Sequence, residues 1–416
     1  MKAGVFFKLV VIAGVVCAAA QNASDPQPGT RAARIEAERQ KKATELQPDN
    51  PGIAERIVAR VSEGIFTNIA HIPGFSVKLG GMVTGSGFAL GPQYERAFLD
   101  EHLLMIGHAA VSTRKWELAE FGLHYGRLPG DHFFANLDSA YRNFNSLNYY
   151  GSGPNTFKSG RTDYRLESVN ADATVGIRPV APLEVGFQSG VAAVNVGPGQ
   201  DDTYASTDAV YPPAAAPGID RQTMFVRAGP VASFDYLDSD RLPRSGGLYM
   251  ARYLWYHDQQ LNRYSFRRST AEVQQYVPLF HKTHVLAFRI RTAFSTADSG
   301  QIVPFYMQPV LGGDDLRGFR PFRFYGNNME VANAEYRWNV FSGLDLAAFY
   351  DTGKVFQNTG DWTPSHLEHS VGFGVRFSTP SAMAMRIDTG FSREGFQILV
   401  KFDNVWTSVD NRGRGW

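Results

Sequence analysis

Apolar and polar residues alternate with a period of two through much of the C-terminal half of the chain. Within 284–294, Phe288 and Ile290 fall on one face, and Arg289 and Arg291 fall on the other. The same alternation recurs in 370–377, 383–391 and 396–402. A period of two is that of a β-strand whose two faces meet different environments. Because one face is continuously apolar and the other repeatedly carries full charges, the pattern predicts the strands of a β-barrel.

The alternation alone leaves the sense of that barrel open. In a soluble barrel the apolar face points inward and the charged face meets water. In a membrane barrel the apolar face meets lipid and the charged face lines a polar lumen. Three further observations favour the membrane form: the number of strands, the aromatic content and the sequence of the first twenty residues.

The whole pattern predicts sixteen strands joined by two kinds of connection. Most connections on one side are tight turns, whereas the other side carries the long segments 150–163, 197–222 and 298–330. Short turns on one side and long loops on the other are typical of outer-membrane barrels. We therefore expect an all-β fold, a sixteen-stranded antiparallel transmembrane β-barrel over 75–402, with both ends of the sheet on the periplasmic side. Because 197–222 is rich in Asp, Ala and Pro, we expect it to be a poorly packed surface loop.

The composition narrows the class of protein further. Aromatic residues make up 13% of the 416 residues, and no run of eighteen apolar residues follows the N-terminal segment, which fits a membrane barrel better than a helical membrane protein. Lys and Arg total 41 against 40 Asp and Glu, so there is no basic excess of the kind that nucleic-acid binding needs.

The first twenty residues have the layout of a secretory signal peptide: a short positive start, an apolar run, and small residues before Gln21. An uncleaved anchor is the alternative, but the apolar run is too short to span a bilayer as a helix. We expect cleavage after Ala20, which also removes Cys17, the only cysteine. The mature chain then has no disulfide, zinc–thiolate site or cysteine nucleophile.

Residues 21–74 differ from the rest and are expected to form a periplasmic helical segment. The stretch 31–46 is charged all round, whereas 53–65 carries an apolar stripe that needs a surface. That surface is the periplasmic mouth of the barrel, the membrane interface or a partner protein. At the other end of the chain, residues 403–416 are expected to form a polar tail.

Enzyme signatures are missing from the sequence. It contains no Gly-x-Ser-x-Gly elbow and no Walker-type or dinucleotide-type glycine loop. His281 and His284 flank a predicted turn without nearby acids at metal-ligand spacing. We therefore expect no enzymatic activity, no cofactor and no metal site.

Several short motifs carry a resemblance to a known family. Residues 311–319 read LGGDDLRGF, and 334–338 and 349–355 read AEYRW and FYDTGKV. In their order along the chain, and together with 149–154 and 235–247, these segments resemble the bacterial surface antigen family, the barrels of the BamA/TamA type. The match runs from about residue 74 to 402, and LGGDDLRGF is similar to the family's sixth extracellular loop motif.

The residues of this motif suggest a contact inside the barrel. The alternation places Glu335 and Asp351 on the lumen face of adjacent strands. The resemblance implies that the sixth loop folds inward and that Arg317 meets these acids, with Gly318 passing close to the wall. A guanidinium presents a planar fork of donors that suits carboxylates. Ordinary lumen charges are the alternative. The expected loop-lock residues are Leu316, Arg317, Gly318, Phe319, Glu335, Asp351 and Gly353.

The resemblance also implies a function. Such barrels insert or translocate proteins at the outer membrane through a weakly closed seam between the first and last strands. We expect the partners to be outer-membrane lipids and nascent outer-membrane or translocated protein clients, with no nucleic acid, and the protein to be a monomer. Residues 21–74 are too few for a complete POTRA module, so we expect a POTRA-less member. A passive channel, or a structural barrel that no longer handles clients, is the alternative.

Overall fold

The computed structural model describes residues 73–80, 82–128, 130–239, 242–341, 343–378, 383–402 and 406. The expected signal peptide, all but the last two residues of the expected helical segment 21–74, and the expected tail 403–416 apart from Trp406 lie outside the described residues. Those three assignments, and the expected absence of a POTRA module, stay predictions.

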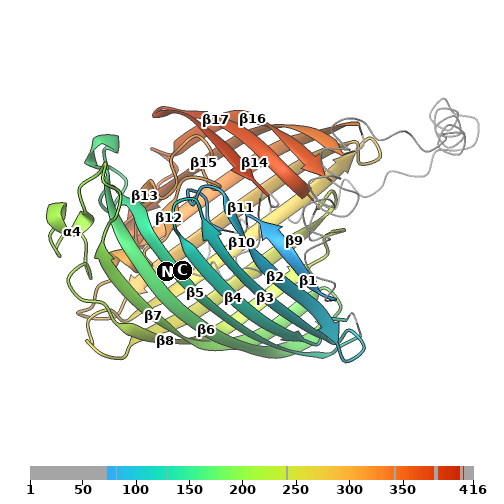
Figure 1. The fold of residues 1–416 in the computed structure, drawn as a ribbon, viewed down its shortest axis with the longest axis horizontal. Coiled ribbons are helices and arrows are strands. Elements are labelled where there is room, and N and C mark those ends of the chain that lie inside the picture. Colours follow the sequence, from blue (N-terminus) through green and yellow to red (C-terminus); the bar gives the residue numbers. More distant parts are fainter. Residues whose placement is uncertain are drawn as a thin grey trace, which may run out of the picture. The chain divides into compact units, whose positions relative to one another are not determined.

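Sixteen strands form one continuous antiparallel sheet in which each strand pairs with the next along the chain (Figure 1). The number and order agree with the sequence prediction. The strands are β1 (Phe75–Leu79), β2 (Ala89–Phe98), β3 (Leu103–Ser112), β4 (Glu117–Tyr125), β5 (Phe133–Tyr149), β6 (Thr162–Val180), β7 (Leu183–Pro198), β8 (Met224–Asp235), β9 (Gly246–Asp258), β10 (Phe266–Leu279), β11 (His284–Ala297), β14 (Asn328–Phe341), β15 (Leu344–Phe356), β16 (Glu368–Ser378), β17 (Met383–Ser392) and β18 (Gly395–Lys401).

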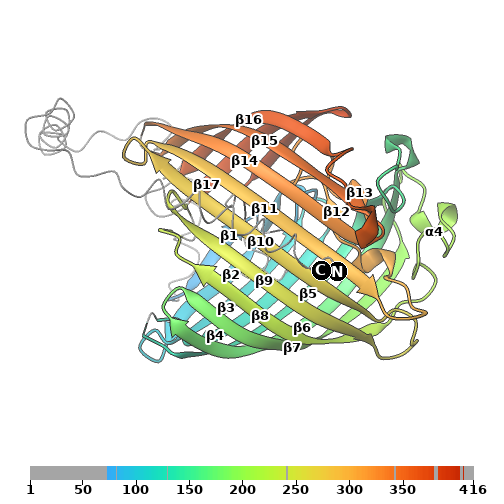
Figure 2. The same ribbon diagram turned by 180° about the vertical axis from the view of Figure 1, so that it is seen from behind.

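The sheet curves around a lumen, and the view from behind shows the strands of the opposite wall crossing those of the front (Figure 2). β1 and β18 are the two ends of the strand order. Within the described residues their backbones are not paired with each other, so the ladder of hydrogen bonds does not close the ring.

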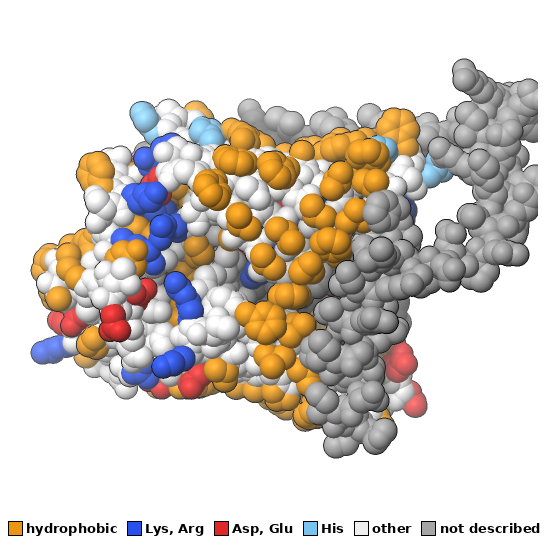
Figure 3. All heavy atoms as spheres, turned by 45° about the horizontal axis from the view of Figure 1, so that its top comes forward, with side chains coloured by type: hydrophobic (Ala, Val, Ile, Leu, Met, Phe, Trp, Pro, Cys, Tyr) orange, Lys and Arg blue, Asp and Glu red, His pale blue; other side chains and the backbone are white. Residues whose placement is uncertain are grey.

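The two faces of the sheet have the polarity of a membrane barrel. On the outer face, Phe373, Phe396 and Ile398 are each about 60% exposed. On the inner face, Arg376 and Arg386 are fully buried. Figure 3 shows apolar side chains spread over the strands, with charged side chains gathered toward the end that carries helix α4 (Thr207–Val210). Apolar residues outside and charges inside are the reverse of a soluble barrel.

The connections also divide as predicted. Tight turns lie at one end, which we call the turn end, and the longer segments lie at the other, the loop end. The sixth connection at the loop end, residues 298–327 between β11 and β14, contains the short pair β12 (Val310–Leu311) and β13 (Phe324–Tyr325). We call it the sixth loop. None of the helices in the described part of the chain is long and apolar enough to cross a membrane.

Several loops pack together inside the loop end. Phe305 of the sixth loop lies between Tyr149 and Tyr164, with ring centroids 5.0 Å from each. Tyr325 lies 5.0 Å from Tyr149, and its hydroxyl is 3.2 Å from that of Tyr164. These four buried rings form the loop-end aromatic core. Ring pairs at such distances stabilise a core beyond the area they bury.

The expectation that 197–222 packs poorly was wrong in part. Thr207 and Ala216 are fully buried, and the Tyr149 hydroxyl donates to the Ala215 carbonyl at 3.0 Å. The small residues that make this segment look like a weak packer let its backbone lie close against the aromatic core.

Candidate functional site

The sixth loop is anchored by its apolar residues before any charge is considered. Leu316 and Phe319 are fully buried, and Phe319 meets the ring of Phe324 at 5.2 Å. They belong to a buried apolar cluster with residues of β14 and β15, among them Val331 and Val355. Burying side chains of this size contributes about 1.5–3 kcal/mol each. The cluster holds the residues on both sides of Arg317 in the sequence, so that the Arg317 side chain extends into the lumen.

Arg317 then meets two carboxylates on adjacent strands. Its Nε and Nη2 donate to the two oxygens of Asp351 on β15, at 2.9 and 2.7 Å. Its Nη1 donates to Glu335 on β14. The Arg317 backbone amide also donates to Asp351, at 3.1 Å. The bidentate contact with Asp351 is the geometry that a guanidinium fork and a carboxylate favour.

The surroundings of Arg317 keep it charged although it is fully buried. Burial works against its charge, but the carboxylates of Asp351 and Glu335 outweigh burial and raise the pKa of Arg317 above its ordinary value. The guanidinium also lies 3.4 Å from the ring centroid of Phe349 on β15, a cation–π contact. Arg317 is therefore a permanent cation held on one face by a ring and on its edges by two acids.

Two glycines allow the loop backbone to approach the wall. A side-chain carbon on Gly390 of β17 would lie 2.6 Å from the Arg317 carbonyl. One on Gly318 would lie 2.7 Å from the Ser370 side chain on β16. Real Cβ atoms are not found at such distances, so this close approach needs glycine at both positions.

The ion pairs continue across the lumen wall toward the last strand. Glu335 also binds Arg376 of β16 at 3.0 Å, and Arg376 lies 2.6 Å from Asp388 of β17. Asp388 binds Arg386 at 2.6 Å, and Arg386 binds Asp314 of the sixth loop at 2.7 Å. Asp314 lies 3.3 Å from Lys401 of β18. We call this path the lumen charge chain. It alternates four cations with four carboxylates: Lys401, Asp314, Arg386, Asp388, Arg376, Glu335, Arg317 and Asp351.

A second branch reaches the turn end. Arg337 donates to Glu335 at 2.8 Å and to the Pro243 carbonyl, in the turn between β8 and β9, at 3.3 Å. In the same turn, Arg244 binds Asp345 of β15 at 2.8 Å. Trp406 is buried here and its ring centroid lies 5.9 Å from that of Tyr276. Glu335 therefore links the sixth loop to a turn folded over the opposite mouth.

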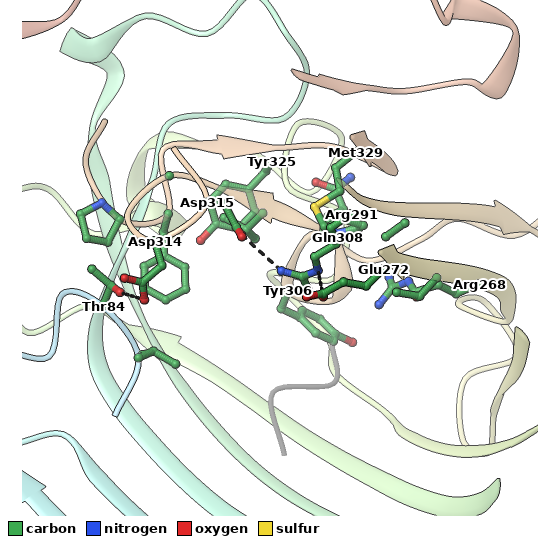
Figure 4. Close-up of a pocket in the computed structure, with 18 of the residues that line it drawn as sticks. Thr84, Arg268, Glu272, Arg291, Tyr306, Gln308, Asp314, Asp315, Tyr325 and Met329 are labelled. Carbon is green, nitrogen blue, oxygen red and sulfur yellow. Dashed lines mark hydrogen bonds and ion pairs between the residues drawn. The ribbon is translucent and has the colours of Figure 1, made fainter. Parts of the chain in front are cut away.

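A third group of charges holds the sixth loop to β10 and β11, beside a lumen cavity of about 170 Å³ (Figure 4). Asp315 accepts hydrogen bonds from Arg289 at 2.7 Å and from Arg291 at 3.2 Å. Arg289 also binds Glu272 at 3.0 Å. Neighbouring residues Asp314 and Asp315 thus bind different parts of the wall, β17 and β18 for Asp314 and β11 for Asp315.

The structure brings together most of the residues singled out from the sequence. Arg317, Glu335 and Asp351 are in direct contact, and Gly318 lies at the close approach. Leu316 and Phe319 pack beside them. Gly353 lies on β15 opposite Val331, where β14 and β15 pass closely.

Sequence reasoning missed the partners farther along the charge chain. Arg376, Arg386 and Asp388 were visible as charges on the lumen face of 370–377 and 383–391, but nothing in the alternation shows which charge meets which. Asp314 carried no signal beyond its place in the motif.

The contacts of the charge chain hold the sixth loop against the strands of the wall. No nucleophile–base pair takes part in the charge chain, and the described residues contain no group of three or more His, Cys, Asp or Glu placed to hold a metal ion. Removing one partner from a buried ion pair costs about 3–5 kcal/mol, so the position of the sixth loop depends on these contacts.

Comparisons with known proteins identify the family and the fold. The family model for the Omp85 superfamily domain matches residues 128–397. The structure of BamA from Haemophilus ducreyi lacking POTRA domains 1–3 is similar, with a TM-score of 0.57 and 13% identity, over 78% of this chain and 69% of that one. CdiB from Escherichia coli is similar with a TM-score of 0.52 and 11% identity, over 78% of this chain and 61% of that one.

At these identities the structural likeness shows the fold alone, and this chain spans well short of the full length of either protein. No curated protein matches the chain by sequence. The family match, in contrast, covers well over half of the chain and includes the sixth loop and strands β14 to β17. The protein therefore belongs to the Omp85 superfamily and is a β-barrel of the bacterial outer membrane.

Proposed function

We propose that this protein inserts or translocates other proteins at the outer membrane, using the junction of β1 and β18 as a lateral seam. The observation that carries the proposal is the unpaired state of these two strands, which are the ends of the sheet in the described residues. An edge strand presents free backbone donors and acceptors, and a client strand can pair there by β-augmentation.

The contacts across this seam are weak compared with a strand ladder. The rings of Phe88 and Phe402 meet edge to face at 5.8 Å, and Lys401 donates to the Met82 carbonyl at 3.1 Å. A cavity of about 520 Å³ lies between residues 80–89 and 397–402. β1 itself has only five residues. These features support a seam that can part at a lower cost than any paired junction in the sheet.

The sixth loop takes the role of an internal lock in this proposal. Arg317, seated on Glu335 and Asp351, holds the loop inside the lumen while the barrel is at rest. Clients are nascent outer-membrane proteins or proteins in transit, the lipid bilayer surrounds the apolar outer face, and one copy of the chain forms the working unit.

A passive channel is the second candidate, and the packing of the lumen argues against it. The loop-end aromatic core packs buried rings inside the loop end, and Arg244 of the turn between β8 and β9 binds Asp345 of β15 at the turn end. Selective solute flux would need an open path between these two groups.

A disulfide across the seam tests the proposal. A side-chain carbon on Gly80 would lie 3.2 Å from that of Phe402, close to the spacing of about 3.5–4.5 Å in disulfides. The variant carries Gly80→Cys and Phe402→Cys in a Cys17→Ser chain, so no other thiol competes. Gly80 has φ +73°, so its replacement adds about 1–3 kcal/mol of strain. The control pair, Thr389→Cys with Ile398→Cys, joins β17 to β18 at partnered positions.

Both variants are reconstituted in phospholipid vesicles and given an unfolded eight-stranded outer-membrane barrel, whose folding is followed by its gel shift. We expect the oxidised seam pair to fall to the rate of empty vesicles and to recover with reductant, whereas the oxidised control pair stays active. Full activity of the oxidised seam pair would reject insertion through this seam. Equal folding by the wild type and empty vesicles would favour the channel or structural barrel.

A further inference from the structure

Asp314 of the sixth loop touches both sides of the seam. One of its carboxylate oxygens accepts a hydrogen bond from Thr84, in the segment between β1 and β2, and lies 3.3 Å from Lys401 of β18. The other oxygen accepts from Arg386 of β17 at 2.7 Å. Figure 4 shows Thr84 pointing at Asp314. A single loop residue thus contacts both sides of a junction that has no strand ladder among the described residues.

Lys401 reinforces this bridge. Its ammonium donates to the Met82 carbonyl at 3.1 Å and to the Thr84 hydroxyl at 3.4 Å, on the β1 side of the seam. The ammonium needs several acceptors when its surroundings exclude most water, and Asp314 supplies the charged one. Without Asp314, Lys401 loses the charged acceptor of this bridge, and its hold on the β1 side weakens.

The bridge is mechanically tied to the proposed lock. Asp314 and Arg317 are three residues apart on the same loop, and both are bound to the lumen charge chain. Between them, Leu316 is fully buried in the apolar cluster. Asp314 cannot stay at the seam if Arg317 leaves its acids and carries the intervening backbone away.

We propose that Asp314 is a clasp that holds the seam closed only while the sixth loop is seated. This inference rests on the proposed seam and names the residue that regulates it. Seating the loop brings a carboxylate between Thr84 and Lys401, and unseating the loop withdraws it. Loop seating and seam closure are then coupled: a change that favours one also favours the other.

The adjacent residue offers a matched control. Asp315 has the same charge and sits on the same loop, but it binds Arg289 and Arg291 of β11, on the wall away from the seam. Asp314→Asn and Asp315→Asn therefore make the same change in charge one residue apart. Lys401→Met removes the clasp from the β18 side and serves as an independent second variant.

The test uses the purified full chain in lipid vesicles, without any client, and the seam pair Gly80→Cys with Phe402→Cys as the reporter. The rate of disulfide formation under a fixed mild oxidant measures how often the seam is closed. We expect Asp314→Asn and Lys401→Met to slow it about tenfold, equal to about 1.4 kcal/mol. Asp315→Asn, which loosens the loop at β11 but leaves the carboxylate between Thr84 and Lys401, should slow it less than either of these.

Arg317→Ala should slow closure as much as Asp314→Asn, and the double variant no further, because both remove the same clasp. An unchanged rate in Asp314→Asn and Lys401→Met, an equal loss in Asp315→Asn, or additive losses in the double variant would each overturn the clasp. The closure assay contains no client, so its outcome is separate from that of the insertion assay. An oxidised seam pair that still inserts clients would reject the proposed function. The closure rates would still decide whether Asp314 holds the seam.

Discussion

Replacing Arg317 by alanine tests whether the charge chain holds the sixth loop. The substitution removes four side-chain contacts at once: two with Asp351, one with Glu335 and the stacking on Phe349. It leaves the apolar anchors of the loop in place, because Leu316 and Phe319 pack in a separate cluster. The strand ladder of the barrel is untouched. We therefore expect the loop to loosen while the barrel remains folded.

The magnitude follows from the burial of the pair. Arg317, Glu335 and Asp351 are all 2% exposed or less. Breaking a buried pair by removing one partner costs about 3–5 kcal/mol. At about 1.4 kcal/mol for each factor of ten, the population of the unseated loop should rise by roughly 10²- to 4 × 10³-fold. In Arg317→Lys, the population of the unseated loop should lie between those of the wild type and Arg317→Ala. An ammonium keeps the charge but loses the planar fork of donors and most of the stacking.

Hydrogen exchange of the purified protein in lipid vesicles measures this population directly. Amides of 311–325 should exchange faster by that factor in Arg317→Ala. Those beside the turn between β6 and β7, at the turn end and away from the sixth loop, should not change. The gel shift of the folded barrel on heating checks that the strands remain intact. Equal exchange in the wild type and Arg317→Ala would show that the loop is held by its apolar residues alone.

Three other changes probe the same structure at different points. Gly390→Ala should speed hydrogen exchange in the sixth loop although every ion-pairing residue is still present, because the added side chain meets the loop backbone. The control is Gly197→Ala, whose added side chain meets nothing within 4 Å. Equal exchange in the two variants would reject the close approach. Phe305→Ala should lower the free energy of unfolding by about 3–5 kcal/mol and raise single-channel conductance, since Phe305 is fully buried in the loop-end aromatic core; unchanged conductance would mean that this core does not seal the mouth. Asp238, in the turn between β8 and β9, has a pKa below its usual 3.8: burial opposes its charge, but the hydrogen bond from Lys282 and two backbone amides outweigh burial. Its contribution to stability is therefore present above about pH 4 and lost as the pH falls toward the lowered pKa, and Asp238→Asn should flatten the urea midpoint in that window; the same slope in both proteins would contradict it.

The fold could be predicted from the sequence because short-range patterns of residues specify the strands of the barrel. Alternation of apolar and polar residues marks the two faces of a strand. Phe373 and Arg376 lie on the outer and inner faces that their spacing predicts. The connections are marked by turn residues and by length, so the strand count and the place of the sixth loop followed. These are short-range properties that a single sequence carries.

The partners within the charge chain could not be predicted in the same way. Alternation places Arg386 and Asp388 in the lumen but gives no register between strands, and the register decides whether Asp388 faces Gly374 or another residue. The contacts of Asp314 depend on how a thirty-residue loop folds back across the lumen. Arg317 was within reach only because a family motif supplied the long-range contact that the local pattern lacks.

The two acids that hold Arg317 should contribute unequally. Glu335 shares its charge among three guanidiniums, those of Arg317, Arg337 and Arg376. It therefore keeps two cationic partners when the loop leaves. Among the described residues, Asp351 keeps only neutral side-chain donors, from Asn333 at 2.9 Å and Ser370 at 3.2 Å. The cost of unseating the loop is thus concentrated on Asp351.

Double-mutant cycles separate these two couplings. Arg317→Ala is combined with Asp351→Asn in one cycle and with Glu335→Gln in the other, and loop exchange gives the free energies. We expect the Arg317–Asp351 coupling to exceed the Arg317–Glu335 coupling by at least about 1 kcal/mol, because a carboxylate left without any cation in a buried site is the more costly product. Equal couplings, or the reverse order, would mean that charge sharing along the chain does not ease the release of the loop, and that the alternating chain is no more than a set of independent pairs.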